Sequence, residues 1–201
     1  MVCLEKTLKN FQKNGFGAKY FPDKDTAAQW LAQQLSPGQL AAFGGSETIK
    51  QIGLAERLEN MGVEILDFWN VPADQRRAAF IRSLDADAYF CSANAVTEEG
   101  HYFNVDGMGN RTASTIYGPH KLFIVAGINK LVKNQEEAFA RAEIAGPKNC
   151  RRMGTKAPCT ADGKCHDCSS PDRACRVYVL TKRPARTVDT TIVLIGEELG
   201  Y

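Results

Sequence analysis

Four cysteines lie within seventeen residues of this 201-residue chain, in the run CTADGKCHDCSSPDRAC. Two of them form a Cys-x2-Cys pair, whose tight turn can bring both sulfur atoms to one side of a metal ion. The two others lie close enough in sequence to complete a tetrahedron of thiolates. The sequence therefore predicts a metal site, with the ligands Cys159, Cys165, Cys168 and Cys175 and with Cys150 as an alternate ligand.

The spacing of these cysteines leaves the identity of the centre open. Zinc and iron–sulfur clusters both accept four thiolates, and the spacing matches neither common ferredoxin pattern. Free thiols in a flexible loop, or disulfides in an oxidised sample, are the alternatives. A segment of this length with little periodicity, about 149–176, is uncommon unless something pins it. This favours zinc or an iron–sulfur cluster as the cofactor.

Basic residues gather around the cysteines. Between Lys148 and Arg186 there are ten Lys or Arg and three Asp, a formal charge of +7 in a chain whose net charge is +2. Positive charge lowers the pKa of thiols and would stabilise a negative metal–thiolate centre. The stretch contains one aromatic residue, Tyr178, so the stacking platforms of nucleic-acid binders are missing. We expect no nucleic-acid partner.

Two glycine-rich loops follow predicted strands. In FGGSETIKQIGL, Gly44 and Gly45 allow a sharp turn, Ser46 is the expected N-cap of the next helix, and Thr48 adds a hydroxyl in its first turn. Free N–H groups at such a helix start can hold an anion. A tight turn with a good cap is the alternative interpretation.

The second loop, NVDGMGNRTAS, places polar side chains directly after a strand, where ligands bind in open α/β folds. Arg111 could form paired hydrogen bonds to a carboxylate or a phosphate. A turn with a surface arginine is the alternative. Lys130, after the strongest strand, could place an ammonium group near the same site, although a lone lysine that starts a helix is normally solvated.

Strands and helices alternate along the chain. The patterns predict helices over 4–14, 25–35, 73–84 and 135–145, the last ending at Gly146-Pro147, and two more beginning after the glycine loops. They predict strands over 17–21, 39–43, 63–69, 88–96, 101–105, 121–127, 176–181 and 190–196. Nearly continuous apolar strands of this kind indicate an α/β fold with a mostly parallel sheet covered by helices on both faces. The length suits one domain over 1–201, with the Cys-rich segment, about 149–176, as an insertion near the C-terminus.

The apolar runs are too short for a membrane span. The longest, Leu122 to Ile128, falls far below the roughly 20 residues that a bilayer requires. The first residues, MVCLEKTLKNFQK, have regularly spaced lysines and no apolar core of a signal peptide. We therefore expect no membrane partner and a cytoplasmic location, where thiols stay reduced.

The ordered set GGSETIKQIGL, NVDGMGNRTASTIYGP, VAGINKLV, AGPKNCRR and CTADGKCHDCSSPDRAC resembles the short branch of the lactate-utilisation (LUD) family, over roughly Leu4 to Tyr201. The resemblance implies a fold of the NagB/RpiA/CoA-transferase-like type. It also implies that both glycine loops line a pocket for a small anionic metabolite, a carboxylate or a phosphate. The residues concerned are Gly44, Gly45, Ser46, Glu47, Thr48, Asn104, Asp106, Gly107, Gly109, Asn110 and Arg111.

Three functions fit the resemblance. The first is an accessory protein or subunit in 2-hydroxy acid (L-lactate) oxidation, with a cysteine-bound metal or iron–sulfur centre, acting as a homodimer or with other lactate-utilisation proteins. The tandem ferredoxin motif of some relatives is absent here. The second is a CoA-transferase-like or phosphosugar-type enzyme, because TEEGHYF resembles the Glu-x-Gly turn of CoA transferases and would make Glu98 the nucleophile. The third is a non-enzymatic redox or ligand sensor.

Overall fold

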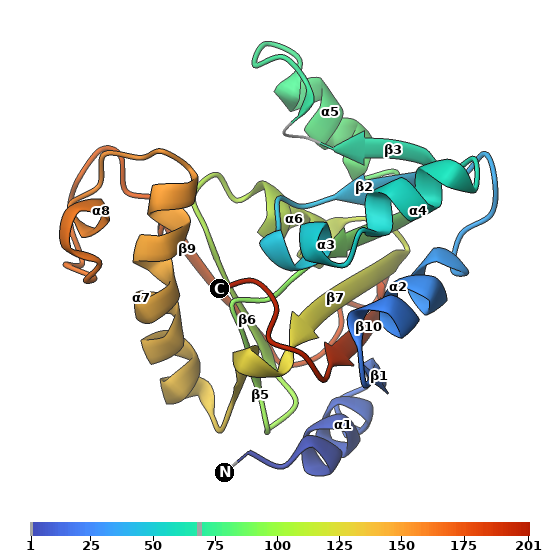
Figure 1. Ribbon diagram of the computed structural model, residues 1–201, viewed down its shortest axis with the longest axis horizontal. Coiled ribbons are helices and arrows are strands. Elements are labelled where there is room, and N and C mark those ends of the chain that lie inside the picture. The colour runs from blue at the N-terminus through green and yellow to red at the C-terminus, as the bar shows by residue number, and fades with distance from the viewer. Residues whose placement is uncertain (1, 68–69) are drawn as a thin grey trace.

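The computed structural model describes residues 2–67 and 70–201. Its centre is a six-stranded sheet in the order β1-β10-β7-β4-β2-β3, in which all neighbours pair in parallel (Figure 1). The strands are β1 (Gly17–Phe21), β2 (Leu40–Phe43), β3 (Glu64–Asp67), β4 (Ala88–Cys91), β7 (Lys121–Gly127) and β10 (Asp189–Ile195). The predicted mostly parallel sheet is confirmed. The last two residues of the strand predicted over 63–69, Phe68 and Trp69, lie outside the described residues.

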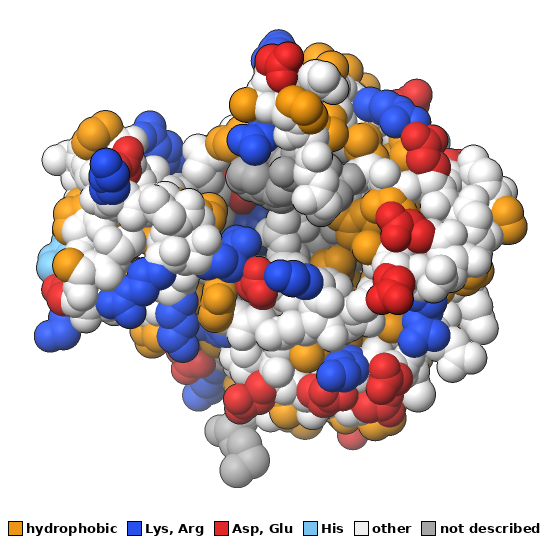
Figure 2. Space-filling view, turned by 45° about the horizontal axis from the view of Figure 1, so that its top comes forward, with side chains coloured by type: hydrophobic (Ala, Val, Ile, Leu, Met, Phe, Trp, Pro, Cys, Tyr) orange, Lys and Arg blue, Asp and Glu red, His pale blue; other side chains and the backbone are white. Residues whose placement is uncertain are grey.

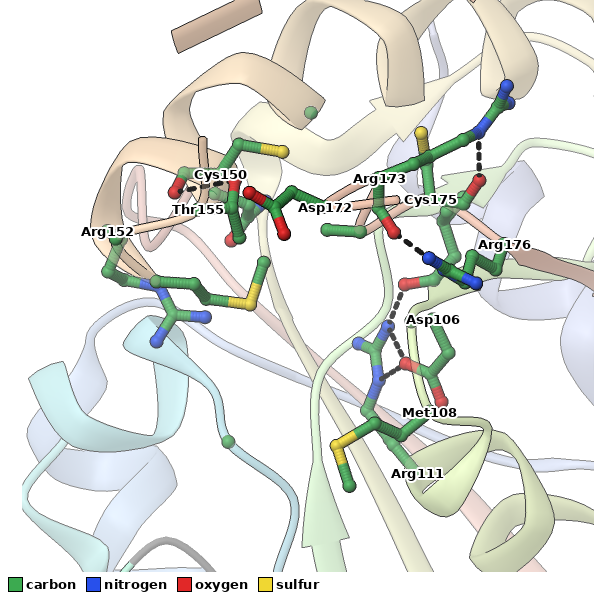
Figure 3. Close-up of a pocket in the computed structure, with 18 of the residues that line it drawn as sticks. Asp106, Met108, Arg111, Cys150, Arg152, Thr155, Asp172, Arg173, Cys175 and Arg176 are labelled. Carbon is green, nitrogen blue, oxygen red and sulfur yellow. Dashed lines mark hydrogen bonds and ion pairs between the residues drawn. The ribbon is translucent and has the colours of Figure 1, made fainter. Parts of the chain in front are cut away.

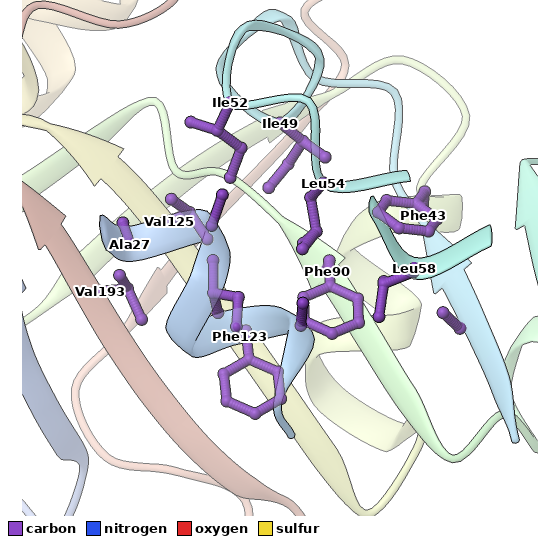
Figure 4. Packing of buried hydrophobic residues seen from close by; sticks show 14 of the residues in the cluster. Ala27, Phe43, Ile49, Ile52, Leu54, Leu58, Phe90, Phe123, Val125 and Val193 are labelled. Atoms are coloured by element: carbon purple, nitrogen blue, oxygen red, sulfur yellow. The ribbon is translucent and has the colours of Figure 1, made fainter. Parts of the chain in front are cut away.

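Side chains alternate between the two faces of this sheet, as the period of a strand requires. In β7, Phe123 and Val125 enter one core cluster, whereas Leu122 and Ile124 enter the other. The first face is covered by α2 (Lys24–Ala32), α3 (Glu47–Gln51) and α4 (Leu54–Asn60), whose apolar side chains pack on it (Figure 4). The second face is covered by α1 (Leu4–Lys13) and α5 (Arg76–Ser83). The predicted cover of helices on both faces is therefore confirmed.

A second, four-stranded sheet in the order β8-β5-β6-β9 was not predicted. It consists of β5 (Ala95–Thr97), β6 (Tyr102–Asp106), β8 (Leu131–Val132) and β9 (Val177–Thr181). Tyr102 faces the main sheet, and Phe103 packs toward α7 (Gln135–Arg152). The single strand predicted over 88–96 is wrong, because the chain leaves the main sheet after Cys91 and joins the second sheet at Ala95.

The order of the main sheet contains a topological switch point. After β2 the chain adds β3 on one side and then returns to place β4 on the other side of β2. The loops after β2 and β4 therefore run in different directions, and ligands of open α/β sheets bind in the crevice between such loops. Here the two loops carry the first glycine motif and the triplet Ser92 to Asn94.

The helix predicted to end at Gly146-Pro147 continues to Arg152, so that prediction is wrong. Pro147 cannot donate a hydrogen bond within the helix, a loss that costs about 3 kcal/mol in a helix interior. Apolar burial offsets it, because Ala138, Ala142, Pro147 and Cys150 are all buried along α7. The segment 149–176 thus begins inside α7, continues through the short α8 (Cys159–Asp162) and leads into β9. Its interpretation as an insertion stays a prediction.

Two short elements complete the description: α6 (Asn110–Tyr117), after the second glycine loop, and the 3-10 helix η2 (Ile128–Lys130), after β7. None of the helices within the described ranges combines the length and the apolar character that a membrane crossing would require.

Candidate functional site

A cleft of about 700 Å³ lies beside the switch point. Its walls are the loops at Gly45 and at 105–111, the C-terminal half of α7, and residues 171–176 of the Cys-rich segment. The charged residues in its lining are Arg111, Arg152, Lys156, Arg173 and Arg176, against Asp106 and Asp172. Arg152 lies on one side of the cleft, and Asp106 and Arg111 lie on the opposite side (Figure 3). An excess of positive charge in a concave site attracts anions.

The surface around the cleft is also positively charged. Lys and Arg side chains gather on the part of the molecule that α7, α8 and the following segment form (Figure 2). Seven of the ten basic residues between Lys148 and Arg186 belong to α7, α8 and the segment that ends at Arg176, whereas the last three follow β9. The charge asymmetry along the sequence thus becomes a basic region beside the cleft.

Arg111 is held by the protein itself. Its Nε donates to Asp106 Oδ1 at 3.0 Å, and its Nη1 donates to the Ser92 carbonyl at 2.9 Å. Its Nη2 donates to Asn94 Oδ1 at 3.0 Å and to the Val105 carbonyl at 2.8 Å. These bonds use most of the five N–H groups of a guanidinium. Arg111 therefore joins the loops after β4 and β6, and it contributes charge rather than free donors to the cleft.

Arg152 is differently placed. Its Nη1 lies 3.6 Å from Glu47 Oε1, which is too long for a hydrogen bond. Lys156 is exposed on the same wall of the cleft. Arg152, which forms an ion pair with Glu47, and Lys156 both line the cleft and can offer N–H donors to a bound anion.

Gly107 allows the Cys-rich segment to form a wall of the cleft. A Cβ atom at this position would lie 2.9 Å from the Ala174 carbonyl oxygen, closer than such atoms approach. The Arg176 N–H donates to the Asp106 carbonyl at 2.9 Å beside this contact. A side chain at position 107 would therefore push the two segments apart.

The predicted anion-site residues divide between the cleft and its surroundings. Gly45, Asp106, Gly107, Asn110 and Arg111 line the cleft, whereas Gly44, Ser46, Glu47, Thr48, Asn104 and Gly109 do not.

Ser46 caps α3, because its Oγ accepts from the Ile49 N–H at 3.3 Å. Asn104 is fully buried, and within residues 2–67 and 70–201 its amide finds no hydrogen-bond partner. Sequence reasoning missed Asn94 and Arg152, because Asn94 lies in the run predicted as one strand and Arg152 lies beyond the predicted end of the last helix.

The five late cysteines line one small cavity of about 30 Å³. Burial, a hydrogen bond with Cys150, and the nearby thiols of Cys150, Cys168 and Cys175 raise the pKa of Cys159. Cys150 is buried, whereas Cys165 is exposed. The thiol of Cys159 therefore interacts with those of Cys150, Cys168 and Cys175, and we call these four residues the thiol cluster.

Arginines hold the backbone around the thiol cluster. Arg173 donates from Nε to the Cys175 carbonyl at 2.7 Å and from Nη1 to the Cys168 carbonyl at 2.8 Å. Arg151 donates from Nε to the Thr160 carbonyl at 2.7 Å and so ties α8 to α7. In the described part of the chain, no three His, Cys, Asp or Glu side chains are arranged to hold a metal ion. The donors are of the right chemical type, but their arrangement is incomplete, and the metal centre stays a prediction.

Glu98 lies in the turn between β5 and β6, outside the lining of the cleft. Its Oε2 accepts from the Cys3 N–H at 2.7 Å, and its Oε1 pairs with Lys6 Nζ at 2.7 Å. The hydrogen bond from Lys6 holds the pKa of this carboxyl below its usual value. These contacts anchor the start of α1.

Lys130 ends η2 and is 4% exposed. Its Nζ donates to Thr48 Oγ1 and to Ser92 Oγ, each at 2.8 Å. It does not line the cleft. The alternative of a solvated lysine does not hold, because the side chain turns inward between the ends of three strands, and a role for Lys130 near the cleft stays a prediction.

A parallel sheet covered on both faces, with a cleft at its switch point, defines an α/β protein of the class that carries ligand sites at strand ends. The LUD domain model matches residues 4–195, and the chain belongs to this family, which is associated with lactate utilisation.

The crystal structure of a DUF162 family protein from Deinococcus radiodurans shares the fold, with a TM-score of 0.57 and 12% identity over 96% of each chain. The crystal structure of eIF2B beta from Chaetomium thermophilum has a TM-score of 0.38 and 17% identity, over 57% of this chain and 41% of that chain. No curated protein matches the sequence.

Proposed function

We propose that this LUD-family chain binds a small anionic metabolite of the 2-hydroxy or 2-oxo carboxylate class in the cleft, as an accessory protein or subunit of L-lactate oxidation. The excess of cations over carboxylates in a cleft beside the switch point carries this proposal. Arg152 and Lys156 offer charge-assisted hydrogen bonds to a carboxylate, and these are stronger than neutral ones. Arg111 adds charge from a fixed position.

The size of the cleft defines which probes are needed. Its volume of about 700 Å³ exceeds the volume of a three-carbon acid and suits ligands of drug size. A larger carboxylate or a phosphate would therefore also fit. L-lactate, pyruvate and inorganic phosphate separate these chemistries, and lactamide serves as the neutral analogue of lactate.

Calorimetry on the full chain tests the proposal. We expect pyruvate or L-lactate to bind and lactamide not to bind, because the amide carries no charge. Arg152→Gln should weaken binding about tenfold, the equivalent of one charge-assisted hydrogen bond. Arg57→Gln, an exposed arginine on α4, is the matched control. Equal affinity for lactate and lactamide, or no effect of Arg152→Gln, would contradict the proposal.

We also propose that the thiol cluster holds a single metal ion, with zinc favoured over an iron–sulfur cluster. The cavity of about 30 Å³ supports one ion, because it is close to the space that one water molecule fills. The ligands would be Cys150, Cys159, Cys168 and Cys175, after side-chain rotation completes the set, while Cys165 stays exposed. Four thiolates around zinc would supply a structural staple for the segment.

Anaerobic purification followed by metal and sulfide analysis tests this site, and titration with Co²⁺ gives a thiolate absorption signal. Cys150→Ser and Cys165→Ser form a matched pair. We expect the first to abolish stoichiometric binding and the second to retain it. Stoichiometric iron with sulfide would rule out the single ion, and loss of the metal in Cys165→Ser would rule out the ligand set.

A further inference from the structure

Three buried polar side chains meet at the ends of three adjacent strands. Thr48 follows β2, Ser92 follows β4 and Lys130 follows β7. Lys130 Nζ lies 2.8 Å from each hydroxyl, and the two hydroxyl oxygens lie 3.3 Å apart. All three residues are at most 4% exposed. The cleft is adjacent, because Asn94 lines it and Arg111 bonds the Ser92 carbonyl.

The Lys130 amine has cationic neighbours but no acidic partner. Within the described ranges no carboxylate pairs with it, and its hydrogen-bond acceptors are the two hydroxyls. Burial, together with Arg141 of α7 and Arg111 of α6, lowers the pKa of Lys130 to about 7, while Cys91 of β4 acts in the opposite direction. A large share of the amine is therefore neutral near pH 7.

A desolvated amine beside other cations is an activated nucleophile for carbonyl carbon. A buried lysine that served packing alone would normally be paired with an acid. We propose that Lys130 forms an imine with the carbonyl carbon of a 2-oxo carboxylate, with the Ser92 and Thr48 hydroxyls as proton relays. The class of ligand rests on the proposed function of the cleft.

The step balances without an oxidant or a reductant. The Nζ lone pair attacks the carbonyl carbon, and the C=O π electrons move to oxygen, which receives a proton from Nζ through a hydroxyl. The C–O bond of this carbinolamine then breaks. Its oxygen leaves as water with the second proton from Nζ, and the nitrogen lone pair forms the C=N bond.

Access to Lys130 requires movement of the segment 196–201, which covers it. The Leu199 carbonyl accepts from Thr48 Oγ1 at 3.3 Å, and the Leu199 N–H donates to Asn129 Oδ1 at 3.1 Å. Gly200 has a φ of +67°, and a Cβ atom there would lie 2.5 Å from Thr48 Oγ1 and 3.1 Å from Lys130 Nζ. The backbone of this segment therefore binds Thr48 and leaves no room for a side chain beside Lys130.

Reductive trapping on the full chain tests the proposal. The protein is incubated at pH 7 with pyruvate and sodium cyanoborohydride, which reduces an imine to a stable secondary amine, and peptides are mapped by mass spectrometry. We expect saturable labelling of Lys130, at least tenfold faster than labelling of exposed lysines such as Lys164. Ser92→Ala should slow the labelling, and Lys130→Arg should remove it, with circular dichroism to confirm the fold.

The outcomes separate this proposal from the anion site. Pyruvate binding in calorimetry without label on Lys130 would overturn the imine and leave the proposed function standing. Label spread evenly over exposed lysines would also overturn the imine. Equal trapping of acetone, which has no carboxylate, would overturn the assignment of the ligand class.

Discussion

At the scale of single residues, the cations near the switch point come from three elements and act on one another. Lys130 follows β7, Arg111 lies in α6 and Arg141 lies in α7. The Asp106 carboxylate compensates the charge of Arg111, because its Oδ1 lies 3.0 Å from Arg111 Nη2. Among residues 2–67 and 70–201, the hydrogen-bond acceptors of Lys130 are two neutral hydroxyls. Burial therefore has the largest effect on the protonation state of Lys130, because the cost of a desolvated charge favours the neutral amine.

The lowered pKa of Lys130 predicts a pH-dependent stability. Between pH 7 and about 10 the unfolded chain binds a proton that the folded amine has released, so the stability of the wild type should rise with pH. The cost of burial is complete below pH 7 and absent above about 10.5. Lys130→Met removes this dependence. The difference in unfolding free energy, wild type minus variant, should rise by up to about 1.4 kcal/mol per pH unit.

Urea unfolding at pH 7, 8 and 9 measures this difference. Lys121→Met, at an exposed lysine, is the control and should leave the slope of the wild type unchanged. A constant difference between wild type and Lys130→Met would show that the amine titrates in its ordinary range.

The sequence identifies some of these residues and hides others. Thr48 and Lys130 could be named as candidates because Thr48 lies in the helix start after one predicted strand and Lys130 lies just beyond another. Ser92 could not, because AYFCSANAV has the composition of one continuous buried strand. The contact between these residues depends on strand order, which local patterns do not encode.

At the scale of elements, α7 joins the two candidate sites. It carries Arg152 to the cleft and Cys150 to the thiol cluster. Both residues lie beyond Pro147, where the sequence predicts that the helix has ended. The Gly-Pro pair is an ordinary stop signal, and the burial of Pro147 and Cys150 along α7 overrides it. Two strands of the second sheet, β6 and β9, were predicted, but β5 was merged with β4 and the two-residue β8 was too short to recognise.

The bonds of Arg173 predict a local change in dynamics. Its guanidinium joins the carbonyls of Cys168 and Cys175, so Arg173→Gln should loosen residues 167–176. We expect amide hydrogen exchange there to accelerate about tenfold, the equivalent of one hydrogen bond to a charged group. Amide hydrogen exchange in α2, which Arg173 does not contact, should not change. Mass-spectrometric exchange measures both, and unchanged protection of 167–176 would show that other contacts hold the segment.

At the scale of the whole molecule, the cleft and the thiol cavity share a wall. Both are lined by Ala142, Gly146, Cys150, Arg173, Ala174 and Cys175. A metal ion that draws Cys150 and Cys175 together would therefore reshape one side of the cleft. If both proposals hold, the two sites are coupled through the residues that line both of them.

This coupling predicts reciprocal binding effects. Zinc should change the affinity for pyruvate at least about fivefold, and pyruvate should change the affinity for zinc by the same factor. Calorimetry of each ligand with and without the other measures the two factors. Cys150→Ser should abolish the effect of zinc on pyruvate binding. No effect of either ligand on the affinity for the other would contradict the coupling.

The architecture was predictable in class but not in detail. Alternating strands and helices were sufficient for a mostly parallel sheet with both faces covered, because each element must bury one apolar face. The strand order and the second sheet arise from pairings between distant segments, such as Val96 with Leu131. Local patterns contain no information on those pairings.

The passage from β4 to β5 has a consequence for how the protein can vary. Cys91 still pairs with Ile124 in one sheet, and Ala95 already pairs with Phe103 in the other. Only three residues connect the two sheets here. An insertion or deletion among them would therefore have to shift the strand register of one sheet. We expect homologous chains to keep this spacing and, at this point of the site, to adapt to different ligands by exchanging the side chains at positions 92 and 94.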